Sequence, residues 1–151
     1  GMSYDILIFE PAAVSDEDFP QWWEQISRWE ELHRCDSLER STPAIRSFYR
    51  DLIRAFPPLN GPDALTDDEA EAHLAQGLPV TDYTIGADFI DVGCSWSAVD
   101  ALVMAVGELA WTHRLAVAYV SDDSSIVRPP ERPARSAPDL QVDYVVQRSK
   151  G

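Results

Sequence analysis

The sequence feature that most constrains the fold is a change of alternation within residues 81–111. The first apolar set is Tyr83, Ile85, Ala87 and Phe89. The second set, which has the opposite parity, is Ile90, Val92, Cys94 and Trp96. Side chains of a regular strand alternate strictly between two faces, so both sets cannot belong to one strand. We therefore predict a hairpin, with a short strand over 82–86, a turn that uses Gly86, and a longer strand over 89–95. A bulge is the alternative.

A long apolar helix is expected directly after this hairpin. Ser97 is placed to cap it by accepting a hydrogen bond from the backbone N–H of Asp100. The helix stripe consists of Val99, Leu102, Val103, Val106, Leu109 and Ala110. This spacing is typical of a helix that faces a core. Met104 and Trp111 lie off the stripe, so we expect the helix to be covered on more than one side.

The N-terminal part of the chain predicts a central strand and two amphipathic helices. Four consecutive apolar residues within 5–10 indicate a strand that is buried on both faces. Ser15 is the expected cap of the first helix, whose stripe is Phe19, Trp22, Trp23, Ile26, Trp29 and Leu32. Thr42 and Pro43 begin the second helix, as cap and first-turn proline. Its stripe runs from Ile45 to Phe56.

Trp22 and Trp23 form one candidate partner-binding feature. Neighbouring residues in a helix point about 100° apart, so one of the two indoles is expected to point away from the other. That indole would line a groove or contact a partner. Core packing is the more common role of tryptophans at helical spacing, and both interpretations stay open.

The most acidic stretch of the chain is a second candidate. Thr66 and Glu69 have the spacing of a capping box, and Gly77 suits the end of a short helix over 67–75. The acidic residues there are Asp67, Asp68, Glu69 and Glu71. They form either a solvated helix start or a surface that steers a basic partner. The spacing of ligands around a glycine that a calcium loop needs is absent.

The net charge of −14 excludes two classes of partner. Phosphate-backbone binding needs clustered Lys and Arg, so nucleic acid is not expected. An anionic membrane surface is disfavoured for the same reason, and no apolar run approaches the ~20 residues of a membrane helix. The charge is unevenly placed, because residues 55–113 hold ten carboxylates and no Lys or Arg. Solubility is one reading of this acidity, and attraction of a basic protein is the other.

The C-terminal part predicts two strands and a tail. A strand is expected over 115–120 and a short returning strand over 126–128. Residues 129–151 are rich in proline and predict an extended tail. Alternating apolar residues within 139–147 indicate an added edge strand there.

In sequence order, these elements give an α+β domain over residues 2–128. Without its insertions the order is β-α-β-β-α-β, which predicts a ferredoxin-like sandwich with both helices on one face of the sheet. An extra helix and an insertion follow the first helix. The strands over 5–10 and 89–95 are expected at the centre of the sheet, and those at 82 and 115 at its edges.

The YDILIFE opening at Tyr4, a strand that ends in Trp96-Ser97 before an Ala-rich helix, and the strand over 115–120 carry a resemblance. Together they resemble a set of small bacterial α+β proteins that often open YDLAVWE and have no established activity. The resemblance spans residues 4–128 and its motifs are structural, so it implies a fold and no catalytic residue. Some proteins of this type resemble antitoxin or immunity partners, which implies a protein-binding role.

No catalytic motif occurs in the sequence. A nucleophile elbow, a phosphate-binding glycine loop, a zinc-binding H-E-x-x-H and a dinucleotide fingerprint are all absent. Cys35 and Cys94 are too few for a disulfide framework or a metal site, so neither a metal nor another cofactor is expected. Cys94 is expected in the core. Because residues 2–30 lack the features of a secretory signal, we expect a cytoplasmic protein.

Two hypotheses of function follow. The first is an acidic protein–protein interaction module of inhibitor or immunity type that uses acidic surface and exposed tryptophan. The second is a small-molecule-binding domain or modest enzyme with a pocket between the sheet and the Trp-rich helix. Self-association through an edge strand or the tail is compatible with both.

Overall fold

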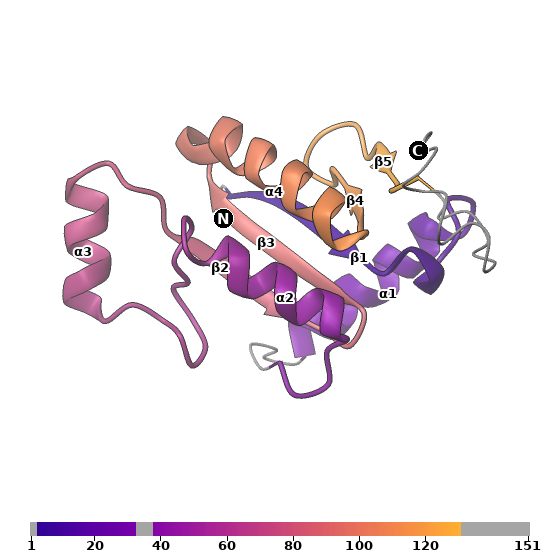
Figure 1. Cartoon of the computed structure of the whole chain (residues 1–151), viewed down its shortest axis with the longest axis horizontal. Helices are drawn as coiled ribbons and strands as arrows, with labels where there is room; N and C mark the ends of the chain where they lie inside the picture. The colour runs from indigo at the N-terminus through magenta and orange to yellow at the C-terminus, as the bar shows by residue number, and fades with distance from the viewer. Residues whose placement is uncertain (1–2, 33–37, 131–151) are drawn as a thin grey trace, which may run out of the picture.

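The computed structural model describes residues 3–32 and 38–130. Within them the chain forms a mixed α+β arrangement, with one five-stranded antiparallel sheet and four α-helices (Figure 1). The strands are β1 (Ser3–Phe9), β2 (Thr81–Ile85), β3 (Phe89–Ser95), β4 (Ala116–Ala118) and β5 (Ile126–Val127). The helices are α1 (Phe19–Leu32), α2 (Pro43–Leu52), α3 (Asp67–Ala75) and α4 (Val99–His113). Short 3-10 turns, η1 (Pro11–Ala13) and η2 (Trp96–Ala98), follow β1 and precede α4.

The strand order is β2-β3-β1-β4-β5, so β1 and β3 lie at the centre as predicted. β1 pairs with β3 along its whole length, from Ser3 opposite Ser95 to Phe9 opposite Phe89. β2 is an edge strand, as predicted. β4 is not an edge, because the returning segment forms β5 and pairs with it. β4 and β5 are both shorter than the sequence pattern predicts.

One face of the sheet carries the larger core, with α2 and α4 packed on it (Figure 1). Ile6 and Ile8 of β1 point to this face and are fully buried. Phe48 of α2 and Val106 of α4 pack in the same cluster. Burying an aliphatic or phenyl side chain stabilises the fold by about 1.5–3 kcal/mol. Near the C-terminal ends of α2 and α4, His113 Nε2 lies 2.7 Å from Asp51 Oδ2.

The opposite face of β1 supports α1. Leu7 and Phe9 point to that face and are fully buried, and Phe19 and Ile26 of α1 pack against them. The helix begins four residues later than its predicted cap, because residues 16–18 form a turn before it. Ser15 Oγ caps that turn instead, accepting from the N–H of Asp18 at 3.1 Å.

The predicted β2–β3 hairpin is present. Its turn is held from both sides: the Gly86 N–H donates to Phe89 O at 2.9 Å, and Ser41 Oγ donates to Gly86 O at 2.8 Å. The N–H of Glu10 donates to Asp88 O at 2.8 Å. The alternation therefore changes parity because the chain reverses at Gly86 rather than bulging.

The outer edge of β2 is covered in part by the chain segment 57–60. Thr81 exchanges backbone hydrogen bonds with this segment, donating to Pro57 O and accepting from the N–H of Leu59. The Asn60 side chain both donates to and accepts from the backbone of Tyr83, at 2.7 and 3.0 Å. These contacts satisfy backbone groups that an edge strand otherwise leaves unpaired.

Two predictions about α4 are wrong. Ser97 does not cap the helix, because the η2 turn shifts the start of the helix to Val99 and Ser97 Oγ lies 3.0 Å from Ser95 Oγ. Met104 and Trp111 are not covered by other described residues, since 68% and 63% of their surfaces are exposed. α4 is therefore buried on one side only, which carries Leu102, Val106 and Ala110.

α3 stands apart from the sheet at the left of Figure 1. The predicted capping box is present: Glu69 N–H donates to Thr66 Oγ1 at 3.1 Å, and Thr66 N–H donates to Glu69 Oε1 at 2.9 Å. Gly77 takes a positive φ of 73° just after the helix, as a helix end requires. α3 buries none of its nine side chains.

Three predictions fall outside the described residues. These are the character of the tail beyond Pro130, the edge strand over 139–147, and the surroundings of Cys35. Cys94 lies in the core as expected.

We predict opposite effects for two glycine substitutions. In Gly86→Ala, the new Cβ would lie 2.2 Å from a ring carbon of Phe89, which is buried and packed against Trp22 and Trp29. Overpacking of this kind lowers the free energy of unfolding by about 1–3 kcal/mol. In Gly107→Ala, on the exposed side of α4, nothing lies within 4 Å of the new Cβ. Removal of a helical glycine there raises the free energy of unfolding by about 0.5–1 kcal/mol.

Urea unfolding of the two variants beside the wild type measures both effects. Equal stability of Gly86→Ala and the wild type would show that the hairpin turn and Phe89 relax without cost.

Candidate functional site

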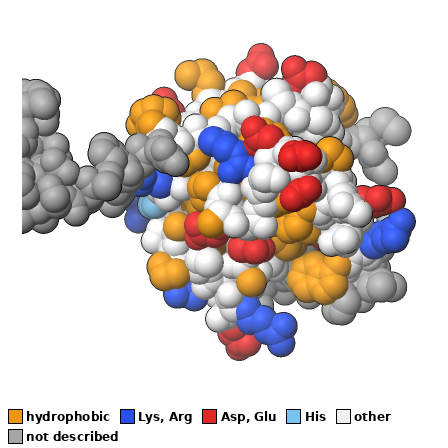
Figure 2. Space-filling view, turned by 90° about the vertical axis from the view of Figure 1, so that its right-hand side faces the viewer, with side chains coloured by type: hydrophobic (Ala, Val, Ile, Leu, Met, Phe, Trp, Pro, Cys, Tyr) orange, Lys and Arg blue, Asp and Glu red, His pale blue; other side chains and the backbone are white. Residues whose placement is uncertain are grey.

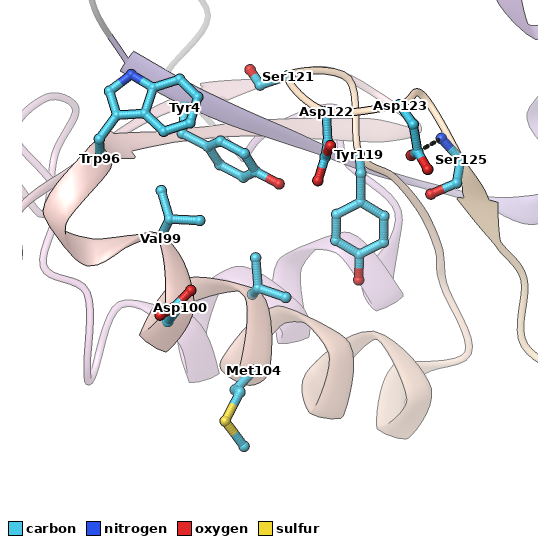
Figure 3. Close-up of a pocket in the computed structure, with 11 residues that line it drawn as sticks. Tyr4, Trp96, Val99, Asp100, Met104, Tyr119, Ser121, Asp122, Asp123 and Ser125 are labelled. Carbon is cyan, nitrogen blue, oxygen red and sulfur yellow. Dashed lines mark hydrogen bonds between the residues drawn. The ribbon is translucent and has the colours of Figure 1, made fainter.

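A hollow of about 830 Å³ lies between the start of α4 and the loop that joins β4 to β5. Figure 3 shows the side chains that line it. They come from β1, η2, α4 and the segment 119–125. We call it the acidic aromatic pocket, and its defining residues are Tyr4, Trp96, Asp100, Tyr119, Asp122 and Asp123.

Aromatic rings form its upper wall in Figure 3. Tyr4 and Trp96 meet edge to face, with ring centroids 5.2 Å apart and planes at 75°. Tyr4 is buried, whereas 56% of the surface of Trp96 is exposed. The Tyr4 ring thus belongs to the core, while its hydroxyl points into the space between Trp96 and Tyr119 (Figure 3).

The loop after β4 is held in a fixed shape, which places its two aspartates. The N–H groups of Asp122 and Ser124 both donate to Tyr119 O at 3.0 Å, and Tyr119 N–H donates to Ser125 O at 2.9 Å. Ser121 Oγ accepts from the N–H of Asp5 at 2.8 Å, which ties the loop to β1. Because these bonds join a loop to the central strand, Asp122 and Asp123 are positioned by the sheet itself.

The pocket is strongly acidic. Asp100, Asp122 and Asp123 line it, and none of the described residues around it is Lys, Arg or His. Hydrogen bonds from Ser125 lower the pKa of Asp123, so this carboxylate stays ionised. Burial, and then the charge of Asp122, raises the pKa of Tyr4, whose hydroxyl stays protonated. The phenol therefore offers a donor and an acceptor beside fixed negative charge.

This arrangement suits recognition of a cation. Aromatic faces attract ammonium and guanidinium groups, and adjacent carboxylates accept their hydrogen bonds. The chemistry that the geometry supports is therefore binding of a positively charged group.

Trp22 and Trp23 lie elsewhere, on α1. Trp22 is half-buried, with its ring centroid 5.3 Å from that of Phe9, and Trp23 packs against the same cluster. Trp22 also lines a shallow groove of about 370 Å³ between α1 and the β2–β3 turn, where Gln25 and Asp88 are the polar residues. Trp23 does not line that groove. Both indoles thus contribute to packing, and one of them also faces a hollow.

The predicted acidic residues on α3 are all exposed: Asp67, Asp68, Glu69 and Glu71. Glu69 is engaged in the capping box described above. Figure 1 shows α3 and α1 at opposite ends of the domain, so the structure does not bring these carboxylates together with Trp22 and Trp23. The two predicted features cannot act as one site.

The face that lies on the right of Figure 1 has mixed charge. Figure 2 shows acidic and basic side chains there beside one another, with hydrophobic side chains between them. Arg28 pairs with Glu24 at 2.8 Å, and Arg128 pairs with Asp16 at 2.7 Å. Acidic and basic side chains thus lie close enough on this face to pair.

The sequence analysis also missed a cluster of carboxyl groups on the α1 face of the sheet. Glu30 of α1 and Asp91 of β3 share a side-chain hydrogen bond, and Asp5 of β1 lies close enough to influence both. Asp91 Oδ1 and Glu30 Oε2 are buried without a further partner among the described residues. Gly93 leaves room for Asp5, since a Cβ there would lie 2.5 Å from Asp5 Oδ1.

Burial controls the protonation of this cluster. It raises the pKa of Glu30 from 4.5 to about 7, and raises the pKa of Asp91 well above its usual range, with Glu30 and Asp5 adding to the shift at Asp91. Two carboxylates that share a hydrogen bond must hold a proton between them, so the pair is expected to carry one near neutral pH.

No group of His, Cys, Asp and Glu within residues 3–32 and 38–130 could hold a metal ion. No helix in that part of the chain is long and apolar enough to cross a membrane. Compared with models of protein families, with curated proteins and with solved structures, the chain shows no match.

We predict that Asp91→Asn raises stability above neutral pH. Between about pH 4.5 and about pH 7 the folded wild type holds protons on Glu30 and Asp91 that the unfolded chain has lost, so its stability falls as pH rises through this window. Asp91→Asn removes the part of this loss that comes from Asp91. Asparagine gives Glu30 a permanent donor without a charge. The free energy of unfolding above this window should rise by about 1 kcal/mol, after allowance for solvent screening.

Thermal unfolding across this pH window measures the effect, with Asp67→Asn at an exposed site as the matched control. Parallel pH profiles for the wild type and Asp91→Asn would contradict a shared proton in this cluster.

Proposed function

We propose that this protein is an acidic protein-binding module, and that its acidic aromatic pocket receives an arginine side chain of a basic partner protein. The observation that carries the proposal is the convergence of three carboxylates and three aromatic rings on one hollow with no basic residue among those that line it. The net charge of −14 supports the same partner, because it speeds association with a positively charged surface.

Arginine fits this pocket better than lysine. Its planar guanidinium stacks on aromatic rings while it donates in the same plane to carboxylates. Trp96 offers a half-exposed indole face, and Asp122 and Asp123 lie across the pocket from it (Figure 3). The ammonium group of lysine is a compact charge that gains less from stacking on a ring. A lysine compound is therefore the matched control for an arginine probe.

We further propose a ferredoxin-like β-α-β-β-α-β arrangement for the domain, with β5 added at one edge. Support comes from the antiparallel order β2-β3-β1-β4 and from α2 and α4 lying on one face, with α1 as the extra helix on the other. The proposal also includes that the protein is bacterial and cytoplasmic, and that it acts as an inhibitor or immunity protein. Self-association is compatible with it.

An alternative function rests on the groove beside Trp22. A small molecule that stacks on this indole and bonds to Gln25 or Asp88 would make the chain a ligand-binding domain or modest enzyme. A ligand screen by thermal shift, repeated on Trp22→Phe, tests it. Stabilisation that is lost in this variant would favour the alternative.

We predict that Nα-acetylargininamide binds the pocket with a dissociation constant of about 1 mM. Nitrogen–proton NMR follows the indole N–H of Trp96 and the backbone N–H groups of the loop 121–125. The double variant Asp122→Asn, Asp123→Asn should bind about fivefold more weakly, because the guanidinium loses two exposed charges that attract it. Added salt should weaken binding further.

The control removes the same two charges elsewhere, in the double variant Asp67→Asn, Asp68→Asn on α3. It should bind like the wild type. Equal losses in the two double variants would attribute binding to overall acidity and overturn the pocket as the site. Nα-acetyl-lysinamide, which lacks the stacking guanidinium, is expected to bind more weakly than the arginine probe.

A further inference from the structure

A second hollow adjoins the acidic aromatic pocket on the other flank of η2. It is a groove of about 400 Å³ beside α3 and the start of α4. Three leucines that line it have large exposed fractions, 40% for Leu59, 62% for Leu74 and 43% for Leu78. We call it the leucine groove. Exposed leucines gathered in one hollow are typical of a surface that binds another molecule.

The turn at η2 contributes residues to both hollows. Trp96 lines the acidic aromatic pocket, whereas its neighbours Ser95 and Ser97 line the leucine groove. The same division continues into α4, where Asp100 lines the pocket and Ala101 the groove. A single extended segment that passes over η2 can therefore reach both hollows.

α3 provides an independent reason to expect a partner in the groove. A nine-residue helix is shorter than the ~12–15 residues at which isolated helices become even marginally stable in water. No side chain of α3 is fully buried, only Ala70 and His73 are half-buried, and the two ends of the helix are closed by the capping box and by Gly77. A partner that covered Leu74 and Leu78 would supply the apolar burial that α3 lacks.

We propose that a basic amphipathic segment of a partner protein crosses η2, with an arginine in the acidic aromatic pocket and an apolar side chain in the leucine groove. This proposal rests on the proposed function, since it takes the pocket as the arginine site. Charge complementarity selects a basic partner, because Asp82 lines the groove and residues 55–113 hold no Lys or Arg. A second copy of this chain would bring a further charge of −14 and is disfavoured.

Fluorescence anisotropy of short labelled peptides tests the proposal on the full chain. One set carries a single arginine in a glycine–serine background, and a second set adds one leucine at increasing separations from the arginine. The leucine should strengthen binding about tenfold at the separation that reaches both hollows, since it moves from water into the groove. Peptides with leucine at the other separations are the internal control.

Two sets of variants locate the contact. Leu74→Ser with Leu78→Ser should remove the gain from leucine and leave binding of the arginine-only peptide unchanged. Trp111→Ser, an exposed apolar residue outside both hollows, should retain the gain. Far-UV circular dichroism checks that α3 persists in the double variant.

The outcomes separate the two proposals. If the arginine probe binds but leucine adds nothing at any separation, the leucine groove is overturned and the proposed function stands. A gain from leucine that survives Leu74→Ser, Leu78→Ser also overturns the groove. If the arginine probe and all peptides fail to bind, the proposed function fails and this inference fails with it.

Discussion

Burial of β1 on both faces is the constraint on which the rest of the structure depends. Ile6 and Ile8 point to one side and Leu7 and Phe9 to the other, and all four are fully buried. A strand of this kind needs a layer of structure on each side, because four exposed apolar side chains would forfeit about 1.5–3 kcal/mol each. α2 and α4 form one layer, and α1 forms the other. β1 pairs with β3 on one side and with β4 on the other, so it lies at the centre of the sheet.

The acidic aromatic pocket is built on the same strand. Tyr4 lies near the start of β1, where the sheet ends and its core gives way to solvent. Its ring is held by the core, and the loop that carries Asp122 and Asp123 is tied to the next residue of the strand, Asp5, through Ser121. A binding site on a rigid strand keeps its geometry without a ligand, which lowers the entropy cost of binding.

The chain holds its negative charge in three distinct settings. On α3 the carboxylates are solvated, and one of them serves the helix itself. In the pocket the carboxylates face aromatic rings and no base, so the charge is available to a cation. On the α1 face of the sheet, Glu30 and Asp91 share a side-chain hydrogen bond, and burial raises the pKa of both carboxyl groups. Carboxyl groups of the same type thus lie in three different environments, and the degree of burial decides how strongly each environment shifts their pKa values.

The sequence by itself determined the features that depend on neighbours in the chain. The hairpin at Gly86, the capping box at Thr66 and the buried strand β1 were all predicted, because each follows from local backbone geometry or alternation. The cap at Ser97 was predicted wrongly, since the η2 turn occupies Trp96–Ala98 and α4 begins only at Val99. The predicted sandwich took the first helix as one of its two helices and placed the extra helix after it, whereas α2 takes that place and α1 covers the opposite face. An apolar stripe does not say which side of a sheet it will meet.

Only the tertiary structure decided the candidate site. Tyr4, Trp96 and Asp122 are distant in sequence, and their spacing follows no motif, so nothing in the sequence brings them together. The turn with Asp122 and Asp123 was recognised as a turn, but its position beside Trp96 depends on the pairing of β4 with β1. Asp91 of β3 and Glu30 of α1 are also distant in sequence, and they meet because the helix packs against the sheet. Local interactions set the elements, and burial of β1 between two layers set what those elements bring into contact.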